Sequence, residues 1–191
     1  MKTIIAAFFV IGAAVIFVFG ALSFTVPSSS HDQDFLRLHI RANSNSVEDQ
    51  DVKYLVKQQI VDELTPIFVD VTTKSQAMDM LAENLARIEE VADACLVANG
   101  FNYGVRAAIK SEHFPTRVYT VSNDKSAGAN NSNNSVTLPE GIYDALIIEL
   151  GSGTGDNWWC CIYPPLCFLE NNIGGEQGVK YRSKLQEWLG K

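Results

Sequence analysis

The chain contains 191 residues, enough for one ordinary domain or two small ones. Hydrophobic residues make up 47% and charged residues 19%, a balance that supports a packed core and excludes a wholly disordered chain. The net charge is −7, because 22 acidic residues outnumber 15 basic ones. Nucleic-acid binding depends on clustered Lys and Arg, so we expect no nucleic-acid partner. Four cysteines are too few for a disulfide-framework miniprotein.

The N-terminal segment is apolar. Residues 4–26 form an uncharged run of 23 residues, and a helix of that length reaches roughly 34 Å, enough to cross a bilayer. Two interpretations compete for residues 1–26: a signal peptide cleaved after Ala21-Leu22-Ser23, or an uncleaved transmembrane anchor. Both predict that residues 31–191 form a single exported domain, which meets a membrane only through this leader.

A strand is predicted at residues 35–42, because apolar and polar residues alternate there. We expect one buried face, with Leu36, Leu38, Ile40 and Ala42, and one exposed face, with Phe35, Arg37, His39 and Arg41.

Two amphipathic helices are predicted next. Ser46 caps the first helix, which has Asp49 in its first turn and ends near Pro66 or continues into residues 67–69. Thr73 and Gln76 form a capping box at the start of the second helix, and Asn99-Gly100 ends it.

Beyond residue 100 the hydrophobic period changes to two, which predicts strands. We expect strands at 103–110 and 117–121, a central strand at 143–150, and a closing helix at 179–189. The polar, low-complexity segment 122–135 is predicted to be a flexible loop. Strands and helices are partly segregated along the chain. This order predicts an α+β fold: one domain with a mainly antiparallel sheet and two or three helices.

The segment 157–168 is dense in aromatic residues, prolines and cysteines. If it is extended, its two adjacent tryptophans point to opposite sides, so one can be buried while the other forms a surface anchor. The proline pair predicts an edge or a surface ridge. The competing interpretation places one Trp and Leu166 in the core, with the prolines shaping a loop. The candidate partner-binding residues are Asn157, Trp158, Trp159, Pro164, Pro165, Leu166 and Phe168.

The cysteines allow a structural and a catalytic interpretation. A disulfide between Cys160 and Cys167 closes a short loop and stabilises it by roughly 2–3 kcal/mol, although other pairings remain open. Cys95 lies on the apolar stripe of a predicted helix, so we expect it to be a small buried residue. The alternative is an exported, cell-wall-associated thiol enzyme that uses Cys160 or Cys167. Cysteine catalysis with a histidine base would instead pair Cys160 or Cys161 with His39 or His113. The cysteine spacing matches no zinc motif and the histidines are scattered, so we expect no metal or other cofactor.

Gly151, Gly153 and Gly155 follow the predicted central strand, as the glycines of a phosphate-binding loop do. However, no helix opens after them and no Lys-Ser/Thr pair follows. We therefore expect a flexible or tightly turning loop that places the tryptophan pair. The carboxylates of Glu89 and Glu90 are expected on the solvated face of a helix.

Two motifs resemble the stage II sporulation protein R family of endospore-forming bacteria. The first is the segment 42–50, which contains Asn43, Ser44, Asp49 and Gln50. The second is the glycine-rich loop with Gly151, Gly153 and Gly155, followed by Asn157-Trp-Trp-Cys160 and by 164–168. The resemblance covers roughly residues 35–170.

The resemblance implies a signal and no enzymatic reaction. It implies export from the forespore into the space between the two sporulation membranes. There the protein would activate a membrane-embedded aspartic protease of the mother cell, which processes the precursor of the sporulation sigma factor E.

Overall fold

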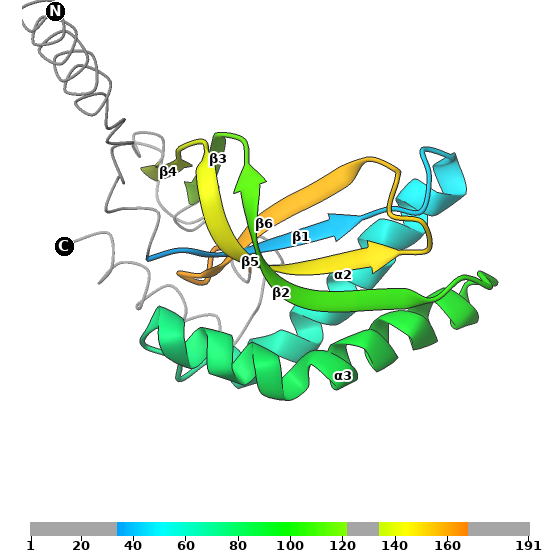
Figure 1. Ribbon diagram of the computed structural model, residues 1–191, viewed down its shortest axis with the longest axis horizontal. Coiled ribbons are helices and arrows are strands. Elements are labelled where there is room, and N and C mark those ends of the chain that lie inside the picture. Colours follow the sequence, from blue (N-terminus) through cyan, green and yellow to red (C-terminus); the bar gives the residue numbers. More distant parts are fainter. Residues whose placement is uncertain (1–33, 122–133, 168–191) are drawn as a thin grey trace, which may run out of the picture. The chain divides into compact units, whose positions relative to one another are not determined.

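A computed structural model describes residues 34–121 and 134–167, all within one compact unit of the chain (Figure 1). The fold is α+β, as predicted. Its elements are β1 (Leu36–Arg41), α2 (Val47–Phe68), α3 (Lys74–Ala98), β2 (Val105–Phe114), β3 (Arg117–Val121), β4 (Asn134–Leu138), β5 (Gly141–Leu150) and β6 (Asn157–Tyr163).

The main sheet has four strands in the order β2-β5-β1-β6, and β3 and β4 form a separate two-stranded sheet. Pairing is mainly antiparallel, as predicted: β2 with β5, β1 with β6 and β3 with β4. The exception is the parallel pair of β1 and β5. Parallel neighbours need a long crossover, and α2 and α3 lie in the chain between these two strands.

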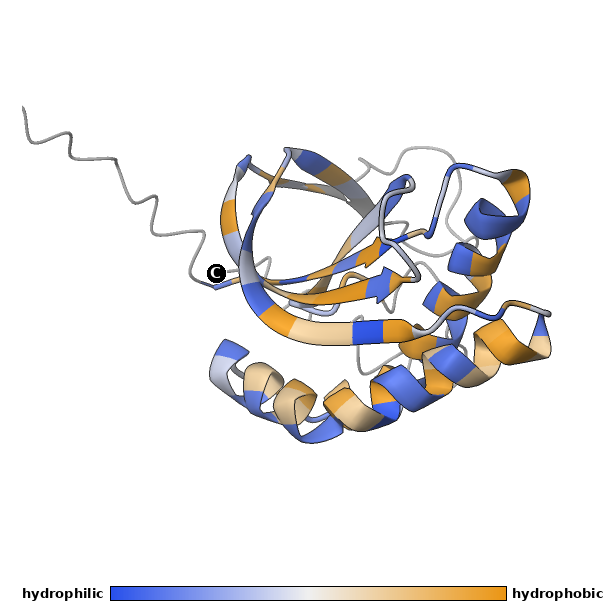
Figure 2. Ribbon diagram, turned by 45° about the vertical axis from the view of Figure 1, so that its right-hand side comes forward, coloured by the Kyte–Doolittle hydropathy of each residue, from blue (hydrophilic) through white to orange (hydrophobic). Residues whose placement is uncertain are grey.

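Both helices lie on the same side of the main sheet (Figure 1), and their apolar bands are visible in Figure 2. The core forms between that face and the helices, because apolar residues recur on one stripe of each helix. Its fully buried side chains include Leu38, Ile40, Val56, Ile60, Leu81, Ile88 and Ile148.

The predicted helix caps are present. The backbone N–H of Asp49 donates to Ser46 Oγ at 3.1 Å, and that of Gln76 donates to Thr73 Oγ1 at 3.2 Å. The Gln76 side chain accepts from the N–H of Thr72 rather than from that of Thr73, so the capping box is shifted by one residue. Pro66 lies inside α2, which continues to Phe68.

The prediction of one exposed face for β1 is wrong. Arg37 is fully buried and His39 is 5% exposed, although both point away from the helices. The reason is that β1 is an inner strand, flanked by β5 and β6. In addition, Tyr119 of β3 reaches over this second face, where its hydroxyl accepts a hydrogen bond from Arg37 Nη2 at 3.0 Å.

The predicted loop at 122–135 is too long at its C-terminal end, because β4 begins at Asn134. Residues 122–133, the leader and the predicted helix at 179–189 lie outside the described residues. Neither α2 nor α3, the helices of the described part of the chain, is long and apolar enough to cross a membrane.

Candidate functional site

The two motifs of the sequence meet at one end of the sheet. Asn43 follows β1 and Ser152 follows β5, and these strands run in parallel, so both loops emerge at the same edge (Figure 1). The backbone N–H of Ser152 donates to Asn43 Oδ1 at 2.9 Å, and the Ser152 hydroxyl donates to the Asn43 carbonyl at 2.5 Å. The N–H of Asp156 donates to Asn45 Oδ1 at 2.6 Å. Segments more than 100 residues apart are thereby held together.

The glycines allow this close approach. Gly151 and Gly153 have positive φ angles of 57° and 64°, a conformation that favours glycine. At Gly155 a Cβ atom would lie only 2.2 Å from the Ser44 carbonyl oxygen. Of the two predicted forms, flexible or tightly turning, the glycine-rich loop is a tight turn. It packs against the first motif, a contact that the sequence did not predict.

Asp49 is the centre of the first motif and is 6% exposed. Its carboxylate accepts hydrogen bonds from Ser44 Oγ at 2.5 Å, Asn43 Nδ2 at 2.9 Å and the Tyr103 hydroxyl at 2.6 Å. Burial by itself raises the pKa of Asp49, but the hydrogen bonds from Ser44, Tyr103 and Asn43 together outweigh burial and lower it. The ionised carboxylate thus ties the start of α2 to the segment that precedes β2.

Lys53 completes this network, although the sequence did not suggest a role for it. It is 1% exposed, and its Nζ donates to Gln50 Oε1 at 2.6 Å and to the Asp156 carbonyl at 3.1 Å. Burial lowers its pKa, and the charge of Asp156 partly opposes that shift. We call Asn43, Ser44, Asp49, Gln50, Lys53 and the loop 151–156 the motif clasp. The polar groups of the clasp form hydrogen bonds with one another, so the clasp stabilises the fold.

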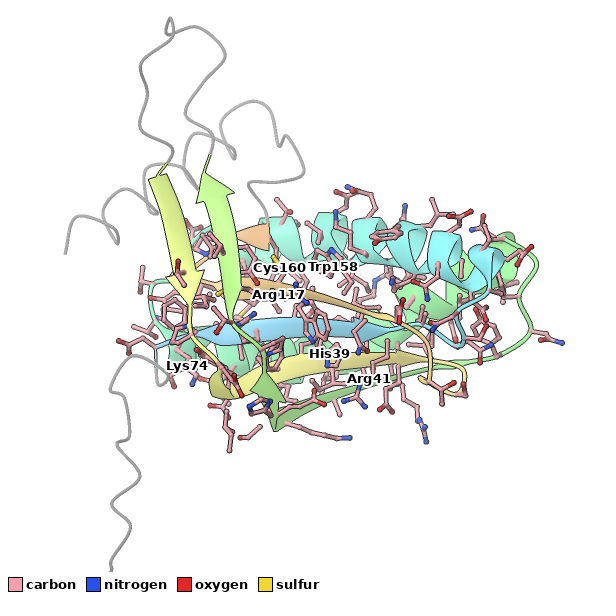
Figure 3. The ribbon with its side chains drawn as sticks, turned by 90° about the horizontal axis from the view of Figure 1, so that it is seen from above. His39, Arg41, Lys74, Arg117, Trp158 and Cys160 are labelled. Carbon is pink, nitrogen blue, oxygen red and sulfur yellow. A yellow bond between two sulfur atoms is a disulfide. The ribbon has the colours of Figure 1, made fainter. Side chains whose placement is uncertain are left out.

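The face of the sheet opposite the helices carries ion pairs (Figure 3). Glu112 on β2 contacts two residues of β1: His39, at 2.8 Å from Nδ1, and Arg41. Arg41 also pairs with Glu149 of β5 at 2.8 Å. These contacts link three neighbouring strands and explain why polar residues alternate along β1.

The two tryptophans of β6 lie on opposite faces of the sheet, as the predicted extended segment requires. Trp159 stacks on His39 with 5.4 Å between ring centroids, and the Arg117 guanidinium lies 4.3 Å from the Trp159 centroid. Trp158 lies on the helix side, where Lys57 Nζ is 5.3 Å from its ring centroid. Both tryptophans are half-buried. Each tryptophan is therefore a partly exposed ring with a cation beside it.

The rest of the predicted ridge lies in the interior. Pro164, Pro165 and Leu166 are buried, so the expectation of a surface ridge is wrong for these three residues. The physical reason is that the chain turns inward after β6. Asn157 is exposed, and Phe168 lies outside the described residues. The expected edge is present, because β6 is the outermost strand on its side of the described sheet.

Cys160 and Cys167 form a disulfide with a Cα–Cα distance of 5.7 Å. The other two cysteines are free thiols. Cys161 is buried, and burial raises its pKa to about 12. Cys95 is half-buried rather than buried, and burial raises its pKa as well. None of the four cysteines is therefore an activated thiolate.

Other groups expected at the surface have structural roles. The carboxylate of Glu89 accepts a hydrogen bond from the backbone N–H of Ala107 at 2.7 Å, so the prediction that Glu89 is simply solvated is wrong. His113 pairs with Glu140 at 3.1 Å on the surface. In residues 34–121 and 134–167 no cluster of His, Cys, Asp or Glu is arranged to hold a metal ion.

Comparisons with known proteins agree with the family resemblance that the two motifs indicate. The family described as stage II sporulation protein R matches residues 32–173. The chain is 32% identical over 154 residues to the stage II sporulation protein R of Bacillus subtilis (strain 168), a match that covers 79% of this chain and 62% of that relative. The chain thus spans less than two thirds of the relative's length. No solved structure matches it. The chain belongs to the stage II sporulation protein R family.

Proposed function

We propose that this chain is a sporulation signal exported from the forespore into the space between the two sporulation membranes. There it activates a membrane-embedded aspartic protease of the mother cell, which cleaves the pro-sequence from the precursor of sigma factor E. Family membership is the main support for this proposal, since the matching region includes both motifs and all of the described residues. The N-terminal leader is the part of the chain that directs export.

In this proposal the protein is a ligand for the protease and performs no reaction itself. A ligand activates by binding the active arrangement of its target more tightly than the inactive one. Such a ligand needs a stable surface and no catalytic residues. The motif clasp holds the start of β6, and the disulfide joins Cys160, in the middle of that strand, to Cys167. Both support the idea that this strand presents that surface.

The structure does not support the residues that were candidates for a thiol enzyme. Cys160 and Cys167 are paired with each other, and the pKa of Cys161 is raised rather than lowered. The imidazole of His39, one of the two proposed bases, is stacked on Trp159 and paired with Glu112. No observation on the described residues favours this second function.

An immunoblot of the sigma-factor precursor tests the proposal. The sporulating cells would lack their own signalling protein and express the full chain only in the forespore. We expect the precursor to shorten. A matched strain would express a chain without residues 1–26, which should not be exported and should leave the precursor intact. An intact precursor in the first strain, with the protein folded and exported, would contradict the proposal.

The tryptophans of β6 provide a prediction for this assay. Replacing Trp158 and Trp159 with Ala should abolish processing, because half-buried Trp residues are frequent binding hot spots. The domain should still fold, which circular dichroism of the purified variant can check. Tyr54→Ala, a change at an exposed aromatic residue of α2, serves as a control and should process normally. Normal processing by the double variant would exclude these residues from the activating surface.

A further inference from the structure

The two layers of the described domain differ in charge. On the helix side, α2 and α3 each carry five acidic and two basic residues. Residues that pair across neighbouring strands point to the same side of a sheet, so the register places Arg106 and Lys110 of β2 on the face opposite the helices. We call this the cationic face; its acidic residues are Glu112 and Glu149, and its basic residues are Arg37, Arg41, Arg106 and Lys110.

The accessible charge of the cationic face lies on β2, whereas Arg37 is fully buried and offers no donor to a partner. The side chain of Arg106 is 76% exposed, and its Nη2 lies 3.5 Å from Glu149 Oε2. That contact is longer than the 2.8 Å between Arg41 and the same carboxylate. Lys110 is exposed and forms no ion pair with the residues that the structure describes. The charges of Arg106 and Lys110 are therefore only weakly compensated within the domain.

A hollow of about 270 Å³ beside β2 brings these two cations to one space. Ala108 and Ile147 also line it, and Ile147 is 3% exposed, so the hollow has a small apolar floor. The two carboxylates that line it already have partners: Glu89 accepts from a backbone N–H of β2, and Glu149 pairs with β1. The hollow therefore suits a carboxylate on a short aliphatic stem, whose charge meets two cations that carry several N–H donors.

The distribution of charge indicates the kind of partner. The whole chain has a net charge of −7, so an acidic partner is repelled by the helix side and attracted to the cationic face. Complementary charge of this kind orients two proteins as they approach. The cationic face also includes Trp159 of β6, with the Arg117 guanidinium 4.3 Å from its centroid. It is thus continuous with one of the residues that we propose as contacts.

We propose that the cationic face docks an acidic segment of the protease, with a carboxylate of that segment in the hollow between Arg106 and Lys110. This inference rests on the proposed function for the identity of the partner. The weakly compensated cations of β2 select an acidic segment, and the acidic helices select the sheet face over the helix side.

Zero-length cross-linking tests the contact on the unmodified full chain. A carbodiimide joins a lysine amine directly to a carboxylate as an amide, with loss of water, so it reports only pairs in contact. In the complex with the detergent-solubilised protease, mass spectrometry should find Lys110 joined to an Asp or Glu of the protease. A formed complex without this cross-link would overturn the inference, and so would a Lys110 cross-link only to a second copy of the chain.

Charge removal tests the acidic character of the segment. Arg106→Gln/Lys110→Gln should weaken binding to the solubilised protease by about tenfold or more at low salt, and added salt should narrow this difference from the wild type. Gln59→Glu/Ala82→Glu, at exposed positions of α2 and α3, is the matched control because it changes the net charge by the same amount. It should change the affinity by less than about twofold.

The outcomes separate this inference from the proposed function. Equal effects of the two double variants would mean that only net charge matters, and would overturn the inference. A wild-type chain that restores processing, together with an Arg106→Gln/Lys110→Gln variant that binds as tightly, would overturn the inference and leave the proposed function standing. A wild-type chain that neither binds the protease nor restores processing would overturn both.

Discussion

At Asp49, three hydrogen bonds lower the pKa of a buried carboxyl, so this group links stability to pH. The pKa in the folded state lies below the unfolded value, so its stabilisation is present above the unfolded pKa and is lost as the pH falls through the folded pKa. Asp49→Asn should lower the free energy of unfolding by about 2 kcal/mol at pH 7, because the hydrogen bonds lose their charge. The difference from the wild type should narrow below about pH 4.

Urea unfolding at pH 7 and pH 3 measures this difference. Asp51→Asn, at an exposed position of the same helix, is the control and should have little effect at either pH. If Asp49→Asn lowers the free energy of unfolding equally at both pH values, the charge of Asp49 has no role in stability.

Gly155 in the clasp and Gly104 outside it differ in the space around them. An added Cβ at Gly155 would collide with the Ser44 backbone, whereas at Gly104 the nearest atom is 3.8 Å away. Gly155→Ala should therefore destabilise the domain by about 1–3 kcal/mol, since the loop must move. Gly104→Ala should be neutral or slightly stabilising. Thermal unfolding of both variants checks this. Equal melting temperatures would show that the loop adapts freely.

At the scale of elements, the disulfide orders the chain after β6. Its cysteines are 7 residues apart, and the chain-entropy estimate for so short a loop is about 2–3 kcal/mol. The Cys160→Ser/Cys167→Ser variant should melt at a lower temperature than the wild type. A reducing agent should lower the melting temperature of the wild type and not that of the variant. A wild-type melting temperature that ignores the reductant would contradict a stabilising disulfide.

The connection between β3 and β4 should tolerate shortening. A deletion confined to residues 123–132 should leave stability nearly unchanged, because each halving of a loop alters closure free energy by only about 0.6 kcal/mol. A deletion that extends through Ser135 should be harmful, because it removes paired residues of β4. Equal stability of the two deletion variants would show that the β3–β4 pairing contributes nothing.

The helices and most strands could be predicted because their signals are local. Ser46, Thr73 and Gly100 mark helix ends through chemistry that acts within one turn. Strand order is a matter of distant pairing, so the parallel contact of β1 with β5 and the burial of Arg37 were not predictable. Both motifs were recognised in the sequence, but their mutual hydrogen bonds join residues more than 100 positions apart. The sequence likewise has no local signal for Lys53 as a partner of Asp156.

In the whole molecule, the proposed function needs a stable surface around β6, and the described residues hold this strand in place. The clasp holds the start of β6, the disulfide joins the middle of that strand to Cys167, and the two tryptophans lie between these two points. This arrangement explains why both motifs occur in one domain although only the second contains the proposed contact residues. It also predicts that clasp variants reduce stability before they reduce binding.

Reconstitution from purified components tests whether the chain activates the protease. The purified full chain would be added to the detergent-solubilised aspartic protease and the sigma-factor precursor. The proposed function predicts that the precursor is cleaved only when both proteins are present, and that a protease with its catalytic aspartates replaced is inactive even with the chain added. Cleavage by the chain alone, or a protease whose activity is unchanged by the chain, would contradict it.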